Sequence, residues 1–532
     1  MRLARRAALA ALATSLLLAL PGLAHAAVYC VNAPGCSGTN EPDLQSALNA
    51  AMGSTGEADT VHVGDPGPPR PAGYGFTDGG IPANQLSIVG AGPAQTVLTS
   101  SNSGSTVLFV QGPGSTISDL TVELPAASAT GISTSGSLAN VNVTSLDSGS
   151  NSQTIANFTG TGNEHWIGGT ASLPSGSGSH GGIFSNMGGG SLDLENLSIR
   201  ADSEGLVSTA GDNITLRRVS LVSTLGLIAQ GAQMTVDDLA FRASGPPGLF
   251  LIASSSGTHD ATANANHVTA FGDGSSNSMG LLATASGGHS ASVNVRNSIM
   301  RNFMFLVNRS ASGSGSVANV TASYSDIALV HKLDNNSSGG TGSVTAGPGM
   351  VDTDPLLTNP TVGDFSLQPG SPVIDAGDPA GLLPGDSVTD VLGAPRISNG
   401  RQDMGATEFQ FVPPTPPPVK DTTAPTLKTS KLPKNLTLKK LLAGITFTVV
   451  PSEPSAIDAT LAGSASSVKL AKNFNLTLAH RKLGLAAGKR RVTLKVRKKL
   501  LGHSRRFSLQ LTLVATDAAG NKRTLKRTIK VH

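Results

Sequence analysis

The chain has 532 residues, enough for about two or three domains, and its composition is unusual for a globular protein. It contains 63 glycines, one tryptophan and three tyrosines, and charged residues make up 14% of it, against about 25% in an average soluble protein. This composition argues against a compact core rich in aromatic side chains. It favours a repetitive β-architecture with small residues at turns and aliphatic residues inside.

Charge is divided unevenly along the chain. Residues 420–532 carry 24 of the 38 Lys and Arg but only 4 of the 34 acidic residues, a formal charge of +20. The preceding residues hold 14 basic and 30 acidic side chains, and Lys332 is their only lysine. Such asymmetry indicates separate modules with separate partners, because a strongly cationic surface attracts polyanions.

The N-terminus has the three parts of a secretory signal peptide. Three arginines within the first six residues precede an apolar run over residues 7–20, and A-H-A at residues 24–26 fits a cleavage site. The run is short for a membrane span, so an uncleaved anchor is the less favoured alternative. We expect removal of residues 1–26 and a mature protein without a transmembrane segment, secreted and either released or held non-covalently at the cell surface.

Two features are expected at the start of the mature chain. Cys30 and Cys36 are the only cysteines, and in an oxidising compartment they predict a local disulfide rather than a metal site, which would need further ligands nearby. Residues 43–51 have apolar positions at helical spacing. This spacing predicts a helix that covers the open end of a repetitive sheet.

A pattern of apolar, any, apolar, two polar, apolar, any, apolar recurs along the middle of the chain. Its copies lie at residues 192–199, 214–221, 234–241, 263–270 and 293–300. One unit of this length cannot bury its apolar side alone, so the copies must stack. Their variable spacing predicts coils of a parallel β-helix with loops of different length.

Stacking would place the two polar positions of successive copies in two columns. One column holds Glu195, Arg217, Asp237, Asn266 and Arg296, and the other holds Asn196, Arg218, Asp238, His267 and Asn297. Neighbouring strands lie about 4.8 Å apart, so opposite charges would face each other, and an exposed pair contributes roughly 0.2–1 kcal/mol. The simplest interpretation of the charged members is therefore structural.

The most specific stretch lies at residues 354–409. It contains GDFSL at 363–367, SPVIDAG at 371–377, GAPR at 393–396 and DMGATE at 403–408. These pieces resemble the closing coils of secreted bacterial right-handed β-helix proteins of the pectate-lyase-like superfamily, those with a choice-of-anchor type terminal region. The resemblance covers roughly residues 27–410. It implies fold and export, and it carries no reaction and no catalytic residues.

Three carboxylates of this stretch stand beside glycines. Asp375, Asp403 and Glu408 are suited to bonding backbone amides at turns. A bound cation, calcium for example, is the less favoured alternative for these carboxylates, and we expect no cofactor and no dedicated metal site.

Beyond this stretch, the Pro-rich residues 411–425 predict an extended spacer. Residues 426–532 then alternate apolar and polar positions in several short runs without a cysteine pair, which predicts a small β-sandwich. The motifs of this part are DTTAP at 421–425, PSEP at 451–454 and ATDAAGN at 515–521. They resemble bacterial Ig-like modules appended to secreted proteins.

Basic residues cluster within this module. The candidate polyanion-binding residues are Lys489, Arg490, Arg491, Arg497, Lys498, Lys499, Arg505 and Arg506. A solvated face that prevents aggregation is the alternative, but lysine-rich surfaces without aromatics suit nonspecific binding of phosphate or carboxylate polymers, with affinity that falls as salt rises. We expect a polysaccharide or an anionic cell-wall polymer as partner, and no sequence-specific recognition of nucleic acid.

A carbohydrate-active enzyme is the main alternative. A lyase needs carboxylates that hold calcium and an Arg or Lys base, and a hydrolase needs paired carboxylates about 5–9.5 Å apart. The NTD, GHG and RIK signatures of polygalacturonase-type enzymes are lacking, so binding or display is favoured over catalysis. The best-placed catalytic candidates are Asp237, Asp238, Arg217, Arg218 and His267.

Residues 145–187 interrupt the recognisable repeat with a Gly- and Ser-rich stretch, which we interpret as a loop insertion. Glu164, His165 and Trp166 within it are candidate ligand-binding residues. Trp166 could stack on a sugar ring while the other two bond its hydroxyls. The alternative is that Trp166 plugs the loop onto the wall of the helix.

The sequence thus predicts an all-β protein, with a right-handed parallel β-helix over residues 27–410 and a small Ig-like β-sandwich over residues 426–532. The predicted role is that of a secreted surface protein that binds or displays extended glycans and is tethered to anionic polymers by its basic module. The alternative is a polysaccharide lyase or glycoside hydrolase acting on acidic polysaccharide.

Overall fold

The computed structural model describes the chain in eleven stretches: residues 26–54, 58–69, 73–77, 85–101, 104–176, 178–209, 211–255, 257–411, 419–463, 476–501 and 506–532. The predicted signal peptide up to residue 25, residues 412–418 of the Pro-rich spacer and Arg505 lie outside the described residues. The chain divides into two compact units, Met1–Val412 and Pro413–His532, and each is described by itself.

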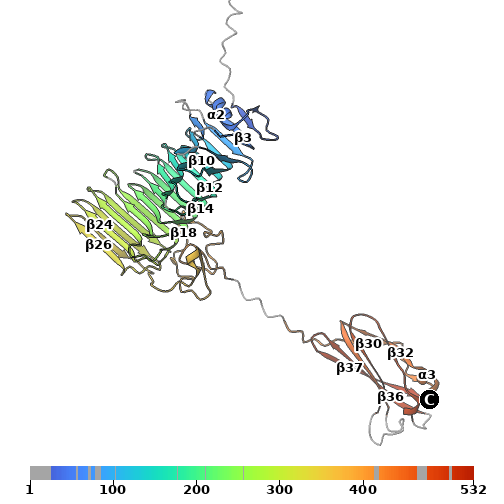
Figure 1. The fold of residues 1–532 in the computed structure, drawn as a ribbon. Coiled ribbons are helices and arrows are strands. Elements are labelled where there is room, and N and C mark those ends of the chain that lie inside the picture. Colours follow the sequence, from blue (N-terminus) through green and yellow to red (C-terminus); the bar gives the residue numbers. More distant parts are fainter. Residues whose placement is uncertain are drawn as a thin grey trace, which may run out of the picture. The chain divides into compact units, whose positions relative to one another are not determined.

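The first unit is a parallel β-helix of about 10 turns, as predicted (Figure 1). Two parallel ladders run along it. In the described residues sheet A has the order β2-β1-β3-β5-β8-β10-β12-β14-β16-β18-β20-β22-β25-β27, and sheet B the order β26-β24-β21-β19-β17-β15-β13-β11-β9-β7-β4. Each coil therefore contributes one strand to each sheet.

The strands of sheet A, with β6 and β23 pairing at its side, are β1 (Val28–Val31), β2 (Thr39–Asn40), β3 (Asp59–Val63), β5 (Leu86–Gly90), β6 (Val97–Thr99), β8 (Thr116–Leu124), β10 (Ser137–Ser145), β12 (Asn163–Ser172), β14 (Ser191–Arg200), β16 (Asn213–Ser223), β18 (Gln233–Ala243), β20 (Ala261–Phe271), β22 (Ser290–Arg296), β23 (Ile299–Arg301), β25 (Val317–Ser323) and β27 (Thr341–Ala346). Those of sheet B are β4 (Tyr74–Thr77), β7 (Ser105–Gln111), β9 (Ala129–Thr134), β11 (Gln153–Thr159), β13 (His180–Asn186), β15 (Glu204–Ser208), β17 (Leu225–Gln230), β19 (Leu249–Ser254), β21 (Met279–Ser286), β24 (Phe305–Ser312) and β26 (Lys332–Ser337).

Most long strands of sheet A bend at one residue with a left-handed backbone. The pairing register skips that residue: Glu195 pairs with Arg217, and the next pair is Leu197 with Val219. Asn, Asp and His tolerate this conformation better than most side chains, which explains the polar pair in the repeat. The two predicted columns are confirmed. The bend residues, with φ between 45° and 58°, are Asp119, Asn140, Asn196, Arg218, Asp238, His267, Asn297 and Tyr324.

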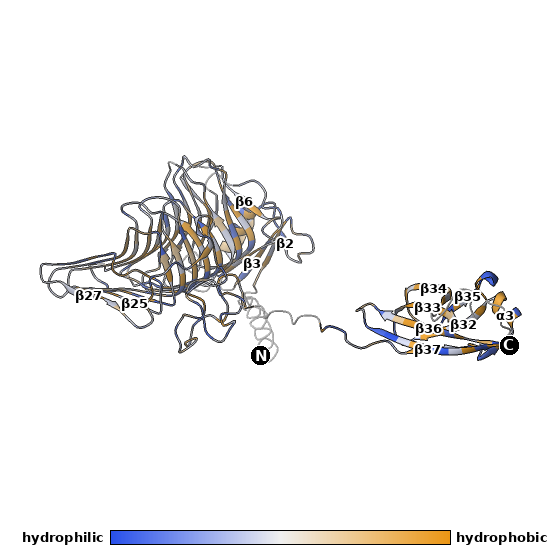
Figure 2. Ribbon diagram, turned by 90° about the horizontal axis from the view of Figure 1, so that it is seen from below, coloured by the Kyte–Doolittle hydropathy of each residue, from blue (hydrophilic) through white to orange (hydrophobic). Residues whose placement is uncertain are grey.

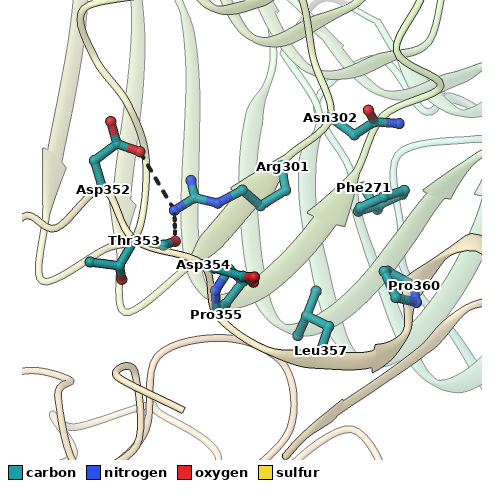
Figure 3. Close-up of a pocket in the computed structure, with 9 residues that line it drawn as sticks. All are labelled: Phe271, Arg301, Asn302, Asp352, Thr353, Asp354, Pro355, Leu357 and Pro360. Atoms are coloured by element: carbon teal, nitrogen blue, oxygen red, sulfur yellow. Dashed lines mark hydrogen bonds and ion pairs between the residues drawn. The ribbon is translucent and has the colours of Figure 1, made fainter.

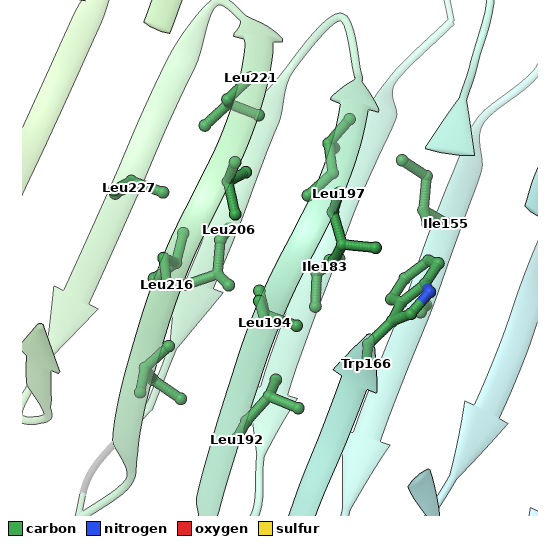
Figure 4. Packing of buried hydrophobic residues seen from close by; sticks show 14 of the residues in the cluster. Ile155, Trp166, Ile183, Leu192, Leu194, Leu197, Leu206, Leu216, Leu221 and Leu227 are labelled. Atoms are coloured by element: carbon green, nitrogen blue, oxygen red, sulfur yellow. The ribbon is translucent and has the colours of Figure 1, made fainter. Parts of the chain in front are cut away.

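Aliphatic side chains fill the interior of the coils. Figure 4 shows Leu192, Leu194 and Leu197 of β14 facing Ile183 of β13 and Leu206 of β15, all of them buried. Burial of such a column from every coil is the main favourable term for the stack, because a single coil would leave its apolar side in water.

The N-terminal end is closed as predicted. Helix α2 (Leu44–Gly53) begins after Asp43, whose carboxylate accepts the N–H of Ser46 at 2.8 Å, and its face of Leu44, Ala47, Leu48 and Ala51 is buried on the coils. Cys30 and Cys36 form the predicted disulfide, with Cα atoms 5.9 Å apart.

The C-terminal end of the coil stack is polar. Inward positions of β24 are Val307, Arg309 and Ala311, and in the last coil they face Lys332, Asp334 and Asn336 of β26. The Nε atom of Arg309 donates to Asp334 at 2.7 Å and its Nη1 atom to Asn336 at 2.8 Å. A buried guanidinium thus ends the interior, which is one way in which natural sheets protect an open edge.

The prediction of a loop insertion at residues 145–187 is wrong. These residues form regular coil strands β11, β12 and β13, and Trp166 lies in register between Leu138 and Leu194. The repeat is hard to see there because glycine, serine and threonine occupy many of its positions.

Residues 354–411, here called the side segment, do not form the predicted closing coils. They contain the short elements β28 (Leu357–Asn359), η1 (Pro360–Val362) and β29 (Asp364–Leu367), of which β28 and β29 pair antiparallel. The segment returns along the side of the helix and bonds to β16, β18, β20 and the β22–β23 coil (Figure 1). It therefore covers the corner columns instead of the end of the stack.

The second unit has two antiparallel sheets consistent with the predicted β-sandwich. One sheet has the order β30-β32-β35 and the other β31-β37-β36-β33-β34, in which β31 pairs parallel to β37. Hydrophobic and hydrophilic positions mix along these strands (Figure 2), and a separate core lies between the sheets. The elements are β30 (Leu427–Ser430), β31 (Asn435–Leu436), α3 (Leu438–Ala443), β32 (Ile445–Pro451), β33 (Ser455–Gly463), β34 (Leu476–Ala486), β35 (Arg490–Leu494), η3 (Lys498–Leu500), β36 (Phe507–Asp517) and β37 (Lys522–Val531).

Within the described stretches, no helix has both the length and the apolar character needed to cross a membrane.

Candidate functional site

The side segment is fixed to the corner columns by a buried ion pair. The guanidinium of Arg396 contacts Oδ1 of Asp238, and neither side chain is exposed. Arg396 also donates to the carbonyl oxygens of Gly405 and Ala406 at 3.0 and 3.1 Å. Burial lowers the pKa of Arg396 to about 10 against the opposing effect of nearby carboxylates such as Glu408, so the group stays charged at neutral pH.

Asp237 holds a second point of the side segment. Its Oδ2 atom accepts the N–H of Ser387 at 2.6 Å, and its Oδ1 atom accepts from Asn266 at 3.0 Å and lies 3.1 Å from Nδ1 of His267. Burial alone would raise the pKa of Asp237, but the hydrogen bond and the charge interaction with His267, together with the Ser387 N–H, bring it below its usual value. Asp237 is therefore an ionised anchor.

The partners of His267 fix the hydrogen on one ring nitrogen. Nε2 of Gln402 donates to two backbone carbonyl oxygens of the side segment at 3.1 and 3.2 Å, so its Oε1 atom is the acceptor that lies 2.9 Å from Nε2 of His267. Nε2 of His267 must therefore carry a hydrogen. Nδ1 lies 2.9 Å from the Asn266 amide nitrogen and 3.1 Å from Oδ1 of Asp237.

The same residues include the best-placed group for a metal or a catalytic centre. Ligand atoms of Asp237, Asp238 and His267 lie within 4.8 Å of one another. The bonds above already engage both ring nitrogens and one oxygen of Asp238, and the side segment leaves Asp238 and His267 with no exposed surface. We therefore correct the expectation of an accessible catalytic group here: the arrangement is a clasp for the side segment.

The two candidate arginines have different surroundings. Arg218 contacts Glu195 of the preceding coil and donates to the Ser387 hydroxyl at 3.1 Å. The charge pairing therefore runs diagonally, from one column to the other. Arg217 instead borders a groove of about 450 Å³ on the outer face of sheet A, together with Asn264 and Arg296. Of the five catalytic candidates, this groove brings only Arg217 and Asp237 together.

A second cavity, of about 500 Å³, lies where the side segment leaves the last coils. Arg301 extends toward Asp352 and the Thr353 carbonyl in Figure 3, and its guanidinium also contacts the buried Asp326. Burial raises the pKa of Asp326 to about 6 even though Arg301 opposes the shift. Sequence reasoning did not single out this cavity. Its lining residues are Phe271, Arg301, Asn302, Asp352, Thr353, Asp354, Pro355, Leu357 and Pro360.

Trp166 is not available to a ligand. It has no exposed surface and lies in the coil interior beside Ile155 and Ile183 (Figure 4). Its ring centre is 6.4 Å from that of Phe158. Glu164 is also buried: burial raises its pKa, and the Ser137 hydroxyl lies 3.2 Å from its carboxylate. Only His165 is at the surface, 3.4 Å from Asp193. We therefore correct the sugar-binding interpretation of these three positions, the less favoured of the two that the sequence left open.

Two of the three carboxylates beside glycines bond backbone amides as predicted, whereas the carboxylate of Asp375 accepts from the side-chain amide of Asn399 at 2.8 Å. Asp403 accepts the N–H groups of Asp375 and Phe409, each at 2.6 Å, and Glu408 accepts those of Asp403 and Ser398 at 3.0 and 3.3 Å. Burial raises the pKa of Asp403 to about 6 and that of Glu408 to about 8. Backbone amides thus already occupy these carboxylates.

The four acidic residues of the basic module lie at two places, and Asp421 among them is exposed. Asp421, Glu453 and Asp517 converge, with one oxygen of each within 4.8 Å of the others. Asp458 is paired with His480 at 2.7 Å and with Lys482 at 3.8 Å. These are all four acids of residues 420–532, so little negative charge offsets the cations.

The structure separates the basic clusters that the sequence suggested. Lys489, Arg490 and Arg491 lie at the start of β35, whereas residues 497–499 follow its end in η3. The backbone from Arg491 to Arg497 spans at most about 20 Å. Arg490 is directed to the backbone carbonyls of Ser455 and Gly484. The predicted residues that the structure describes here therefore lie at both ends of β35.

The outer face of sheet B carries two uncharged columns. The first is apolar and the second, two residues further along each strand, is polar; their register repeats from coil to coil. The apolar column is Phe184, Val207, Ile228, Ile252 and Leu282, and the polar column is Asn186, Gln230, Ser254, Thr284 and Ser310.

Comparison with known proteins adds no relative. No protein-family model matches the chain, and no curated protein matches it.

Arg396 and Gln402 are the functional residues that sequence reasoning missed. Arg396 appeared only as part of a motif, and Gln402 was not noticed. Both act through contacts more than 130 positions away in the chain. The available signal was an arginine in a stretch rich in Asp, which predicts charge pairing without naming the partner.

Proposed function

We propose that this is a secreted protein in which the basic module anchors a glycan-binding or glycan-displaying β-helix to an anionic polymer. The proposal rests on the distribution of charged residues in the basic module. All four of its acids are clustered or paired, while 24 Lys and Arg remain in 113 residues. A surface of this kind attracts polyanions over a range set by ionic strength.

The β-helix supports the second half of the proposal. The uncharged columns on sheet B repeat at about 4.8 Å and offer aliphatic faces beside hydroxyl and amide groups. Such a surface suits an extended ligand with apolar faces and hydroxyls, as a neutral glycan has. Secretion rests on the N-terminal sequence, and we further propose a pectate-lyase-like relationship for the helix and an Ig-like one for the sandwich on the motifs quoted above.

A polysaccharide lyase or hydrolase is the less supported alternative. It would have to use the groove beside Arg217, in which Asp237 is already bonded to Ser387 and Asn266. A hydrolase also needs a second carboxylate facing the first, and Asp386, the nearest acid of the groove wall, is bonded to Arg296 at 2.6 Å.

The test is binding of the mature protein to neutral and acidic polysaccharides across a salt series, with release of reducing or unsaturated products assayed in the same wells. We expect binding of acidic polymers that weakens steeply with salt, and no product. Absence of acidic-polymer binding at low salt would remove the anchor, and product formation would replace the binding role with an enzymatic one.

A further inference from the structure

Strand β37 has an open edge along most of its length. β36 pairs with it from Lys522 to Val531, whereas β31 reaches only Lys530 and Val531. Among the described residues, no other strand pairs with β37. The N–H of Lys530 donates to the Lys434 carbonyl on that edge at 2.9 Å. Because N–H groups alternate in direction along a strand, those at positions 522, 524, 526 and 528 point to the same open edge.

The side chains at these positions form a regular row. Lys522, Lys526 and Lys530 stand opposite hydroxyl residues of β36, namely Thr516, Thr512 and Ser508. Four residues of an extended strand span about 13–14 Å, which is the spacing between successive lysines. Thr524 and Thr528 lie between them, and all five β37 side chains are exposed.

Two arginines flank the same edge from the other face of the strand. Arg523 and Arg527 alternate with the lysines, and both are exposed although Arg527 stands opposite the buried Leu511. The nearest acids lie at the Lys522 end of this edge: Asp517 is buried and accepts the N–H of Asn521 at 2.8 Å, and the exposed Asp421 and half-buried Glu453 converge with it. Cations therefore border both sides of an edge that also presents backbone N–H groups.

We propose that the open edge of β37 is the binding site for a single chain of an acidic polysaccharide that runs along the strand. The inference rests on the proposed anchoring function and narrows it from the whole module to one strand. Carboxylates would contact the lysines and arginines, and the row of hydroxyls and the outward N–H groups would bond sugar oxygens.

The surroundings favour a polysaccharide over nucleic acid. Single-stranded nucleic acids are usually bound by aromatic side chains on which bases stack. The described aromatic residues of the module, Phe447 and Phe507, are buried in its core. A hydroxyl-rich edge that, among the described residues, has no exposed Phe, Tyr or Trp matches sugars with charged groups better than it matches bases.

The experiment compares two variants of the full-length mature protein that lose the same charge. The first combines Lys522→Gln, Lys526→Gln and Lys530→Gln. The control combines Lys428→Gln, Lys439→Gln and Lys495→Gln, which are exposed and lie on β30, on α3 and just after β35. Binding of polygalacturonate is measured over a salt series, with duplex DNA as competitor, and thermal unfolding confirms that both variants fold.

We expect the β37 variant to lose about tenfold or more in affinity and the control to lose about threefold or less. The slope of log affinity against log salt should also flatten by about two in the β37 variant only, since each phosphate-type contact contributes about 0.7–0.9. Equal losses in the two variants would overturn the β37 site and leave the anchor intact. If DNA binds more strongly than polygalacturonate and loses affinity in the same β37 variant, the site exists but its ligand is not a polysaccharide. If the unmodified protein does not bind polygalacturonate at low salt, the anchoring function itself fails.

Discussion

The two units of this protein treat charge in opposite ways. The β-helix buries ionised groups and gives each a partner, as in the contact of Arg396 with Asp238. The sandwich keeps its few acids clustered or paired and leaves its lysines in water, as along β37. Removing one member of a buried ion pair strongly destabilises the fold. Exposed cations hardly affect stability, but they attract charged partners from a distance. In the β-helix, charged groups therefore stabilise the fold. In the sandwich we expect them to attract a binding partner.

The largest expected difference in stability between the two units concerns Arg396. We expect Arg396→Ala to destabilise the β-helix by about 3–5 kcal/mol, because Asp238 would be left buried and ionised. Lys526→Ala in the sandwich should cost less than about 0.5 kcal/mol. Denaturant unfolding measures both, and limited proteolysis should show early cleavage within residues 354–411 in the first variant only.

A double variant distinguishes charge from packing at this clasp. Arg396→Met with Asp238→Asn removes both charges, and Asn tolerates the left-handed backbone at position 238, where φ is 58°. We expect it to recover a large part of the loss. If Arg396→Ala unfolds no more easily than the unmodified protein, the side segment is not held by this pair.

The pH dependence of the two units should also differ. In the folded β-helix the pKa of Asp326 and Asp403 is about 6 and that of Glu408 about 8. A raised carboxyl pKa gives stability that is complete below the unfolded value near 4 and is lost as pH rises through the folded value. We expect the β-helix to lose stability between about pH 4 and pH 8, at up to about 1.4 kcal/mol per pH unit for each group until the pH passes that group's folded pKa.

The sandwich should remain nearly constant over this range, because Asp517 has a lowered pKa and affects stability only under acid conditions. Asp237 behaves likewise in the β-helix. Calorimetry at several pH values checks this expectation. Glu408→Gln should flatten the slope of the β-helix transition, whereas the exposed Asp364→Asn should not; a pH-independent transition in the unmodified protein would contradict the raised values.

The polar end of the coil stack offers a third comparison. We expect Arg309→Leu to cost about 1–3 kcal/mol, since Asp334 and Asn336 lose their buried donor. The variant should also associate end to end, because an apolar interior would then meet water at an open edge. Light scattering with size-exclusion chromatography measures the association. Leu333→Ala on the neighbouring strand β26 is the control, and a monomeric Arg309→Leu protein would show that the arginine does not protect this end.

The smallest expected change in stability concerns Glu164. Its buried carboxyl has a raised pKa, so the ionised form is unfavourable in the folded state. We expect Glu164→Gln to gain about 0.5–1 kcal/mol at pH 7 and nothing at pH 4, since Gln resembles the protonated acid. Thermal unfolding at the two pH values checks this. Unchanged glycan binding would agree with the buried position, and a loss of binding would restore Glu164 as a ligand-binding residue.

Sequence reasoning reached those parts of the fold that repeat locally. The coils around residues 192–300, the capping helix and the disulfide follow from spacing and composition, because each is decided by residues close together in the chain. Even the corner columns were correct in register, although the left-handed residue that produces them was not recognised.

The side segment could not be derived in the same way. Its bonds join positions such as Asp237 and Ser387, which lie 150 residues apart. A periodic pattern contains no information about which distant partner such a group will meet. The candidate catalytic residues were therefore found as a cluster, but their burial under residues 354–411 depended on contacts that no local signal specifies.

The one-residue corners also bear on how such a chain can change in length during evolution. A whole coil could be gained or lost without altering its neighbours, provided that one residue able to adopt the left-handed conformation stands at each bend. The side segment restricts this freedom in the coils that it contacts. It is bonded both to β16 and to the β22–β23 coil, so adding or removing a coil between them would separate it from one of its partners. Homologues of different length should therefore differ on the N-terminal side of β16, with the clasped coils constant in number.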